Sequence, residues 1–167
     1  DLVPMTGENR VLTFYGLKQI NSNPRVGLRA LMGDKTKKLM TSDLAFRIAP
    51  RINAAGRIDH AKKAVEILIE ENRENARFFS ESIEGNNKTR RELDQSITKE
   101  ALQMIDQNKK STVVYSDKWH KGVLGIVASR LIEVHYKPTI VLTESDGVFT
   151  GSARSVHGFD LYEAISK

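Results

Sequence analysis

The hydrophobic period of the sequence changes near residue 108, and this change constrains the fold more than any other feature. Between residues 74 and 107, a stripe of side chains recurs every three or four positions, which predicts one long helix. The stripe consists of Phe79, Ile83, Asn86, Arg90, Leu93, Ile97, Ala101 and Ile105. Because the stripe is polar between Gly85 and Arg91, this helix cannot be buried along its whole length. We therefore expect it to span between two lobes.

After residue 110 the pattern becomes that of a small sheet. Residues 112–115 and 139–142 are short runs of β-branched and apolar residues, with a helical pattern over 122–134 between them. This strand–helix–strand order predicts a parallel pair of strands. Asp146–Gly147 is a turn signal, and a third strand is expected over 148–155. The predicted fold class is therefore α/β: a helical N-terminal part with a long connecting helix, then a small β-α-β-β domain with a mixed or parallel sheet.

The N-terminal part is expected to be helical over residues 8–20, 26–32 and 60–71. The first of these helices has an apolar side, formed by Val11, Leu12, Tyr15, Leu17 and Ile20. The third has another, formed by Ala64, Val65, Ile67 and Leu68. We expect these sides to face a core.

Between these helices lies an arginine segment, residues 47–57, with the sequence Arg-Ile-Ala-Pro-Arg-Ile-Asn-Ala-Ala-Gly-Arg. Pro50 removes a backbone donor and disfavours helical geometry at Ala49, so no regular helix is predicted here. Small residues would let a ligand approach closely, and arginine forms bidentate contacts with phosphate. The segment is either a contact surface for an anionic polymer or a basic loop that ends in a helix cap.

The net charge of +5 is concentrated around this segment. Residues 34–63 contain eight basic and three acidic side chains, and this excess equals the net charge of the whole chain. A local basic excess favours nucleic acid as a partner, although a solvated face has the same composition. The absence of cysteine excludes disulfides and thiolate metal sites. With 40% hydrophobic and 28% charged residues, the composition is that of a soluble globular protein, and no apolar run approaches the roughly 20 residues of a membrane helix. The absence of cysteine fits a reducing cytoplasm, where we expect the protein to be located.

Four stretches in a fixed order carry a resemblance to a known family. They are residues 1–10, 46–57, 119–130 and 151–155. Together they make the chain resemble the RecJ family of single-stranded-DNA-specific exonucleases, within the DHH phosphoesterase superfamily. The resemblance covers nearly the whole chain. It implies that residues 1–45 are the end of a DHH domain.

The resemblance also divides the rest of the chain. Residues 46–110 would be the arginine segment with the connecting helix, and residues 111–167 the N-terminal part of a DHHA1 domain. The chain would then be a fragment that lacks most of the DHH catalytic domain and has a truncated second domain. We expect such a fragment to be inactive alone and to bind no metal.

For the full-length protein, the resemblance implies a metal-dependent phosphodiester hydrolase of DNA repair and recombination that digests single-stranded DNA from the 5′ end. Two Mn²⁺ or Mg²⁺ ions would polarise the phosphate and generate a hydroxide nucleophile. The implied partners are single-stranded DNA, a single-strand-binding protein and a helicase. A membrane is not among them. The oligomeric state stays open.

The family also implies roles for individual residues. Ser152 and Arg154 match positions that contact the terminal 5′ phosphate, with Gly151 and Ser155 beside them. Arg57 matches an arginine near the scissile phosphate.

Weaker candidates surround these positions. Asn53, a catalytic candidate beside Arg57, could donate to the substrate or to a metal-bound water. The others are Arg47, Arg51 and His120 for substrate binding, Trp119 for base stacking, and Asp1 for metal binding with ligands missing from this chain. Arg47 or Arg51 could instead pair with Asp43 or Asp59, Asn53 could cap a helix, and Trp119 could cover the sheet.

Two other functions remain open at this stage. A relative within the superfamily could hydrolyse short oligoribonucleotides, a nucleoside bisphosphate or cyclic dinucleotides. Alternatively, the chain could be a non-catalytic nucleic-acid-binding module.

Overall fold

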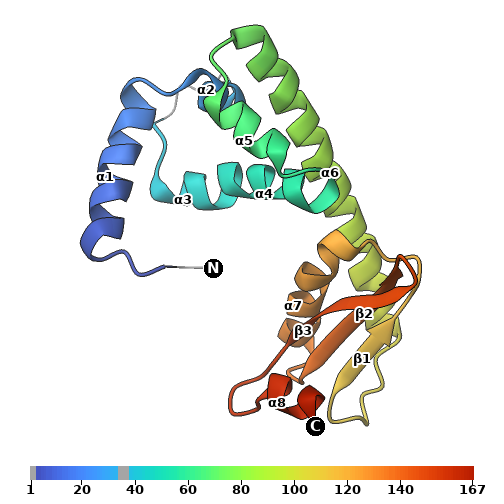
Figure 1. Ribbon diagram of the computed structural model, residues 1–167. Coiled ribbons are helices and arrows are strands. Elements are labelled where there is room, and N and C mark those ends of the chain that lie inside the picture. Colours follow the sequence, from blue (N-terminus) through green and yellow to red (C-terminus); the bar gives the residue numbers. More distant parts are fainter. Residues whose placement is uncertain (1–2, 34–37) are drawn as a thin grey trace. The chain divides into compact units, whose positions relative to one another are not determined.

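The computed structural model describes residues 3–33 and 38–167 of the chain (Figure 1). The predicted metal ligand Asp1 and part of the basic cluster, Lys35 and Lys37, therefore lie outside the described residues. The chain forms two compact units, Asp1–Lys88 and Thr89–Lys167. The division of the sequence at residues 45 and 110 stays a prediction.

The first unit is entirely helical in its described part, as the sequence indicates. Its elements are α1 (Gly7–Ser22), α2 (Val26–Met32), α3 (Thr41–Asp43), a π-helical turn η1 (Leu44–Ile48), α4 (Ala49–Ile58), α5 (Lys62–Ile69) and the first half of α6 (Arg73–Gln103). Helix α6 runs without interruption through Gly85, and it contributes residues to both units. The long helix is thus confirmed.

The expectation of an irregular arginine segment is wrong, because η1 and α4 make residues 44–58 helical. Pro50 is the second residue of α4, where its missing N–H costs no hydrogen bond of a regular helix. In the π turn immediately before α4, the backbone N–H of Ala49 bonds the carbonyl oxygen of Leu44, five residues earlier. Such a turn is wider than an α-helical turn. Pro50 thus lies where the π turn passes into α4, within one continuous helical stretch.

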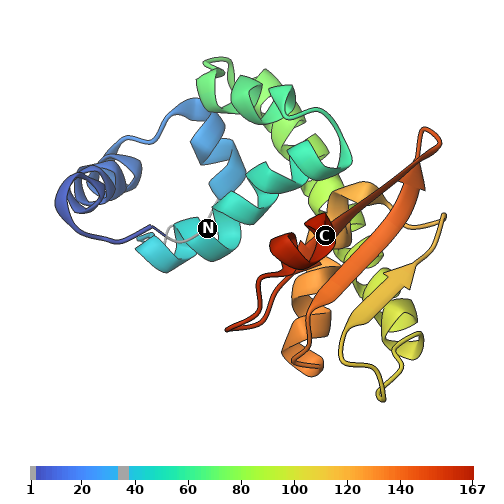
Figure 2. The same ribbon diagram turned by 60° about the horizontal axis from the view of Figure 1, so that its bottom comes forward.

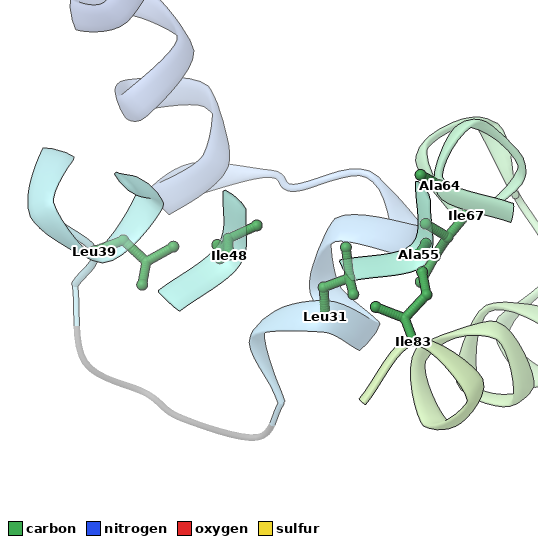
Figure 3. Packing of buried hydrophobic residues seen from close by; sticks show 7 residues of the cluster. All are labelled: Leu31, Leu39, Ile48, Ala55, Ala64, Ile67 and Ile83. Atoms are coloured by element: carbon green, nitrogen blue, oxygen red, sulfur yellow. The ribbon is translucent and has the colours of Figure 1, made fainter. Parts of the chain in front are cut away.

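The core of the first unit joins residues that are far apart in sequence (Figure 3). Its buried members are Leu31, Leu39, Ile48, Ala55, Ala64, Ile67 and Ile83. Gly27 brings α2 directly onto α5, because a Cβ at this position would lie 1.6 Å from the backbone oxygen of Ile67. Only glycine permits this helix contact.

Two predicted apolar sides are partly wrong. In α1, Leu17 and Ile20 pack against the core, whereas the side chains of Val11, Leu12 and Tyr15 are exposed. In α5, Ala64 and Ile67 are buried and Leu68 is partly buried, but Val65 is 57% exposed. The helical spacing identified the helices correctly but made their buried stripes too wide.

The second unit confirms the predicted β-α-β-β arrangement (Figure 2). After the C-terminal half of α6 come β1 (Thr112–Tyr115), a 3₁₀ turn η2 (Lys121–Val123), α7 (Leu124–Val134), β2 (Thr139–Ser145), β3 (Val148–Arg154) and α8 (Leu161–Ser166). The sheet order is β1-β2-β3, with β1 and β2 parallel and β2 and β3 antiparallel. The sheet is therefore mixed.

Helix α7 packs against β2 and β3 on one face of this sheet. Alternate residues of β1 and β2 on this face are buried: Thr112, Val114, Thr139, Val141 and Thr143. Ser152 is paired with Val141, and Arg154 with Thr139. Directly paired residues of neighbouring strands project to the same face of a sheet. The side chains of Ser152 and Arg154 therefore lie on the face that α7 covers.

Along the part of the chain that the structure describes, no helix has the length and apolarity needed to cross a membrane.

Candidate phosphate-binding site

Arg154 is the centre of a polar cluster between β3 and the first turns of α7. Its Nη1 lies 2.9 Å from the carbonyl oxygen of Ala153 and 3.3 Å from Oγ of Ser152. Its Nε donates to Oγ of Ser129 at 3.1 Å, and its Nη2 lies 3.4 Å from the carbonyl oxygen of Gly125. The structure therefore brings together Ser152 and Arg154, the two residues that the sequence singled out for a terminal phosphate.

The charge of Arg154 is not neutralised within the described residues. All its partners there are hydroxyl or carbonyl oxygens, and none is a carboxylate. The residue is also exposed, as Ala153 and Ser155 beside it are. An exposed, positively charged fork of N–H donors beside a hydroxyl can bind a phosphate group through two parallel hydrogen bonds.

The other two residues of the predicted motif have mainly structural contacts. A Cβ on Gly151 would lie 2.3 Å from the backbone oxygen of Val141, so glycine is what lets β3 pair with β2 here. Ser155 donates its hydroxyl to the carbonyl oxygen of Phe159, within the turn before α8. Direct phosphate contacts from Gly151 and Ser155 stay predictions.

His120 and Trp119 precede α7 and differ in their surroundings. The Nδ1 atom of His120 accepts a hydrogen bond from the backbone N–H of Gly122 at 3.1 Å, so a neutral His120 carries its proton on Nε2. Trp119 is only 4% exposed, and its Nε1 donates to Glu100 at 2.9 Å. Base stacking by Trp119 is therefore wrong, because its ring is covered by the protein.

Two arginines of the arginine segment, Arg47 and Arg51, contact carboxylates or carbonyl groups. Arg47 pairs with Asp43 at 2.8 Å, which is the structural pairing considered from the sequence. Arg51 contacts the carbonyl oxygen of Leu31 at 2.6 Å and the carboxylate of Glu84 at 2.8 Å. Arg51 links α4 to α2 and α6, whereas Arg47 pairs within one helical turn. A substrate role for either stays a prediction.

Asn53 and Arg57 lie on the exposed side of α4, one turn apart. The opposite side buries Ala54 and Ala55 completely. Residues four apart on a helix are neighbours on one face, so an amide and a guanidinium are presented together. Asn53 lies in the interior of α4 and therefore does not cap a helix, which removes that structural alternative.

Asp59, just after α4, pairs with Lys63 of α5. The hydrogen bond from Lys63, followed by that from the backbone N–H of His60, lowers the pKa of Asp59 below its ordinary value of 3.8. This pair fixes the turn that ends the arginine segment.

The described residues do not fit a metal site. Within residues 3–33 and 38–167, no three side chains of histidine, aspartate or glutamate come together in a way that could hold an ion.

Sequence reasoning missed several residues that shape the site. Ser129 and Gly125 contact Arg154 but stand 25 and 29 residues before it, and no local spacing links them. Asp94, 1% exposed, pairs with Arg130 at 2.8 Å and ties α6 to α7 within the second unit. Only the polar interruption of the α6 stripe could have signalled Asp94, because it lies one turn beyond Arg90.

Comparisons with known proteins place these observations in a family context. No protein-family model matches the chain. The chain is 38% identical over 175 residues to the single-stranded-DNA-specific exonuclease RecJ of Bacillus subtilis, covering 100% of the chain and 22% of that protein. RecJ of Escherichia coli is 35% identical over 179 residues, again over 100% of the chain and 31% of the relative.

Solved structures agree with the sequence matches. The crystal structure of RecJ in complex with Mn²⁺ from Thermus thermophilus is similar with a TM-score of 0.86 and 33% identity, over 99% of this chain and 25% of that one. A structure of exonuclease RecJ bound to manganese gives a TM-score of 0.85 at 33% identity, over 99% of this chain and 42% of that one. The predicted resemblance is confirmed from end to end, and the chain spans less than a third of the length of the relatives in the sequence comparison.

Proposed function

We propose that this chain, which matches RecJ exonucleases along its whole length, is part of an enzyme that removes nucleotides from the 5′ end of single-stranded DNA. The chain would supply phosphate-contacting side chains, while the ligands of a catalytic metal lie outside its described residues. The observation that carries the proposal is the exposed guanidinium of Arg154, which has no carboxylate partner among the described residues and lies beside the hydroxyl of Ser152.

In this function, Arg154 and Ser152 bind the terminal 5′ phosphate. The guanidinium donates to non-bridging phosphate oxygens, and the hydroxyl of Ser152 supplies a further donor. A phosphate held in this way fixes how far the strand can enter, so it positions the first phosphodiester bond for hydrolysis.

Arg57, with Asn53 beside it, contacts the phosphate that is attacked. Cleavage by water breaks the bond between phosphorus and the leaving oxygen, and negative charge accumulates on the phosphate oxygens. An arginine N–H donor stabilises that charge, and the amide of Asn53 can orient the attacking water. Their shared exposed face on α4 supports this assignment.

The metal of the proposed enzyme is Mn²⁺ or Mg²⁺, since the similar solved structures are RecJ with these ions. When bound, such an ion polarises the phosphate and lowers the pKa of a bound water. Asp1, outside the described residues, remains the one candidate ligand that the sequence suggested. We expect the isolated chain with Mn²⁺ to degrade no DNA.

The natural substrate is single-stranded DNA met in repair and recombination, in the cytoplasm, with a single-strand-binding protein and a helicase as partners. Phosphate contacts dominate such binding, so affinity should fall steeply with salt.

The test uses the full-length protein that contains this chain, with a 5′-phosphorylated single strand and Mn²⁺. Arg57→Ala is expected to lower turnover more than tenfold, because a charge-assisted contact in the transition state is lost. Arg77→Ala is the control, since Arg77 pairs with Glu81 on an exposed face of α6. Near-normal turnover by Arg57→Ala would contradict the assignment.

A series of substrate lengths separates the alternatives. The proposed exonuclease should prefer strands of many nucleotides and release products from the 5′ end. Preference for dinucleotides or for a nucleoside bisphosphate would identify a small-substrate phosphodiesterase instead. Strand binding without any hydrolysis would identify a binding module.

A further inference from the structure

Ser129 accepts a hydrogen bond from the Arg154 guanidinium. The Nε–H of Arg154 points to Oγ of Ser129 at 3.1 Å, and the five N–H bonds of a guanidinium lie in one plane. Fixing the Nε–H direction therefore fixes where the two terminal nitrogens point. Nη1 also lies 2.9 Å from the carbonyl oxygen of the adjacent Ala153, so Ser129 and Ala153 hold the guanidinium together. The contacts of Nη1 to Ser152 and of Nη2 to Gly125 are longer, at 3.3 and 3.4 Å, so a stronger acceptor can replace these two.

The hydroxyl of Ser129 is itself fixed. Its Oγ donates to the carbonyl oxygen of Gly125, one helical turn earlier on α7, at 3.0 Å. Since a serine hydroxyl has one proton, this bond leaves the oxygen lone pairs for Arg154. Ser129 is half-buried, which limits competition from water.

Gly125 provides the space that this arrangement needs. A Cβ at residue 125 would lie 3.3 Å from Oγ of Ser152 and 3.4 Å from Nη2 of Arg154. These are the two groups assigned to the terminal phosphate. An alanine at residue 125 would therefore require the hydroxyl of Ser152, and with it the guanidinium of Arg154, to shift by a few tenths of an ångström.

We propose that Ser129 is a positioning residue, which holds the Arg154 guanidinium ready for the terminal 5′ phosphate of the DNA strand. This inference rests on the proposed function. An exposed arginine loses rotamer freedom when it binds a ligand, whereas an arginine already held in place loses less. Ser129 itself need not touch the phosphate.

The test compares single-stranded substrates with a 5′ phosphate and with a 5′ hydroxyl, in the full-length protein. Ser129→Ala is expected to raise KM for the phosphorylated strand about three- to tenfold, the effect of losing one hydrogen bond. The kcat for both strands, and KM for the hydroxyl strand, should stay within about twofold. Ser129→Thr should restore KM, because a threonine hydroxyl can bond the same carbonyl group one turn earlier.

Ser166→Ala is the matched control. Ser166 donates to the carbonyl oxygen of Tyr162, also one turn earlier, at 2.9 Å, but no arginine contact accompanies it. It should leave both KM values unchanged. If Ser129→Ala behaves like Ser166→Ala while Arg154→Ala loses the preference for the phosphate, the positioning role is wrong and the proposed function stands. If Arg154→Ala also keeps the preference, the part of the proposed function that assigns the terminal phosphate to Arg154 fails.

Gly125→Ala is a second route that does not depend on Ser129. Alanine favours a helix more than glycine does, so this change should not lower the melting temperature through helix propensity. It should still weaken the preference for the 5′ phosphate, by about threefold or more, because its Cβ crowds Ser152 and Arg154. An unchanged preference in Gly125→Ala would contradict the close packing of Gly125 against Ser152 and Arg154, on which the inference depends.

Discussion

Arg154 on β3 differs in its surroundings from Arg47 and Arg51 of the arginine segment, and also from Arg130 of its own unit, which pairs with Asp94 at 2.8 Å. Arg47 and Arg51 of the first unit contact carboxylates, at 2.8 Å each, and Arg51 also binds a backbone carbonyl. Arg154 of the second unit contacts only neutral oxygens among the described residues. Arg51 therefore joins helices through its partners, whereas Arg154 keeps a positive charge that a ligand can use.

This difference shows why a count of basic residues is a poor guide to a binding site. The basic excess around residues 34–63 directed attention to the arginine segment, yet acidic partners neutralise part of it. The single arginine of β3 lies outside that cluster. Its neutral surroundings are visible only once the strand register and α7 are known.

The packing of the first unit should be highly sensitive to a side chain at Gly27. Gly27→Ala would place a Cβ 1.6 Å from the backbone oxygen of Ile67, so α2 and α5 must separate. We expect a loss of roughly 3 kcal/mol in the free energy of unfolding, the upper part of the overpacking range. Urea unfolding measures it, with Gly16→Ala as the control because nothing lies within 4 Å of a Cβ there. Equal midpoints for the two variants would contradict the helix contact.

Arg51→Ala tests whether this arginine mainly stabilises the fold. The change removes the hydrogen bond to Leu31 and a partly exposed ion pair with Glu84. We expect the free energy of unfolding to fall by about 1–2 kcal/mol. Arg77→Ala, which removes a far more exposed pair with Glu81, should change it by less than about 0.5 kcal/mol. A stable Arg51→Ala variant with much weaker DNA binding would instead make Arg51 a substrate contact.

The smallest expected effect concerns acid stability of the arginine segment. The hydrogen bond from Lys63 lowers the pKa of Asp59, so folding favours the ionised carboxylate. Its contribution is present above pH 3.8 and is lost as the pH falls below that value through the lowered pKa. Asp59→Asn should therefore lose less stability between pH 6 and pH 3 than the wild type, as measured by urea midpoints. Identical losses would show that this pair contributes nothing.

Local patterns allowed much of the fold to be predicted from the sequence. Residues 112–115 became β1 and residues 26–32 became α2 with the expected bounds, because β-branched runs and caps are local signals. The arginine segment was misjudged, since the π turn that accommodates Pro50 leaves no sequence signature. The exposed side of α1 was also missed, because spacing shows that a helix is amphipathic but not what covers it.

The site was only partly predictable for a related reason. Motif resemblance identified Ser152 and Arg154, and register then brought both to the α7 face. Ser129 and Gly125 could not be found, because their contacts depend on how a helix packs on a strand 25 or more residues later. Trp119 was open to two interpretations until its burial and its bond to Glu100 were known.

The preference for a 5′ phosphate over a 5′ hydroxyl tests the central claim most directly. We would measure kcat/KM for both single strands in the full-length protein, for the wild type, Arg154→Lys and Arg154→Ala, with melting temperatures alongside. Loss of a charged hydrogen bond should reduce the preference roughly 10- to 100-fold in Arg154→Ala. Arg154→Lys should be intermediate, because lysine keeps the charge without the fork. An unchanged preference in a folded Arg154→Ala variant would contradict the claim that this arginine binds the terminal phosphate.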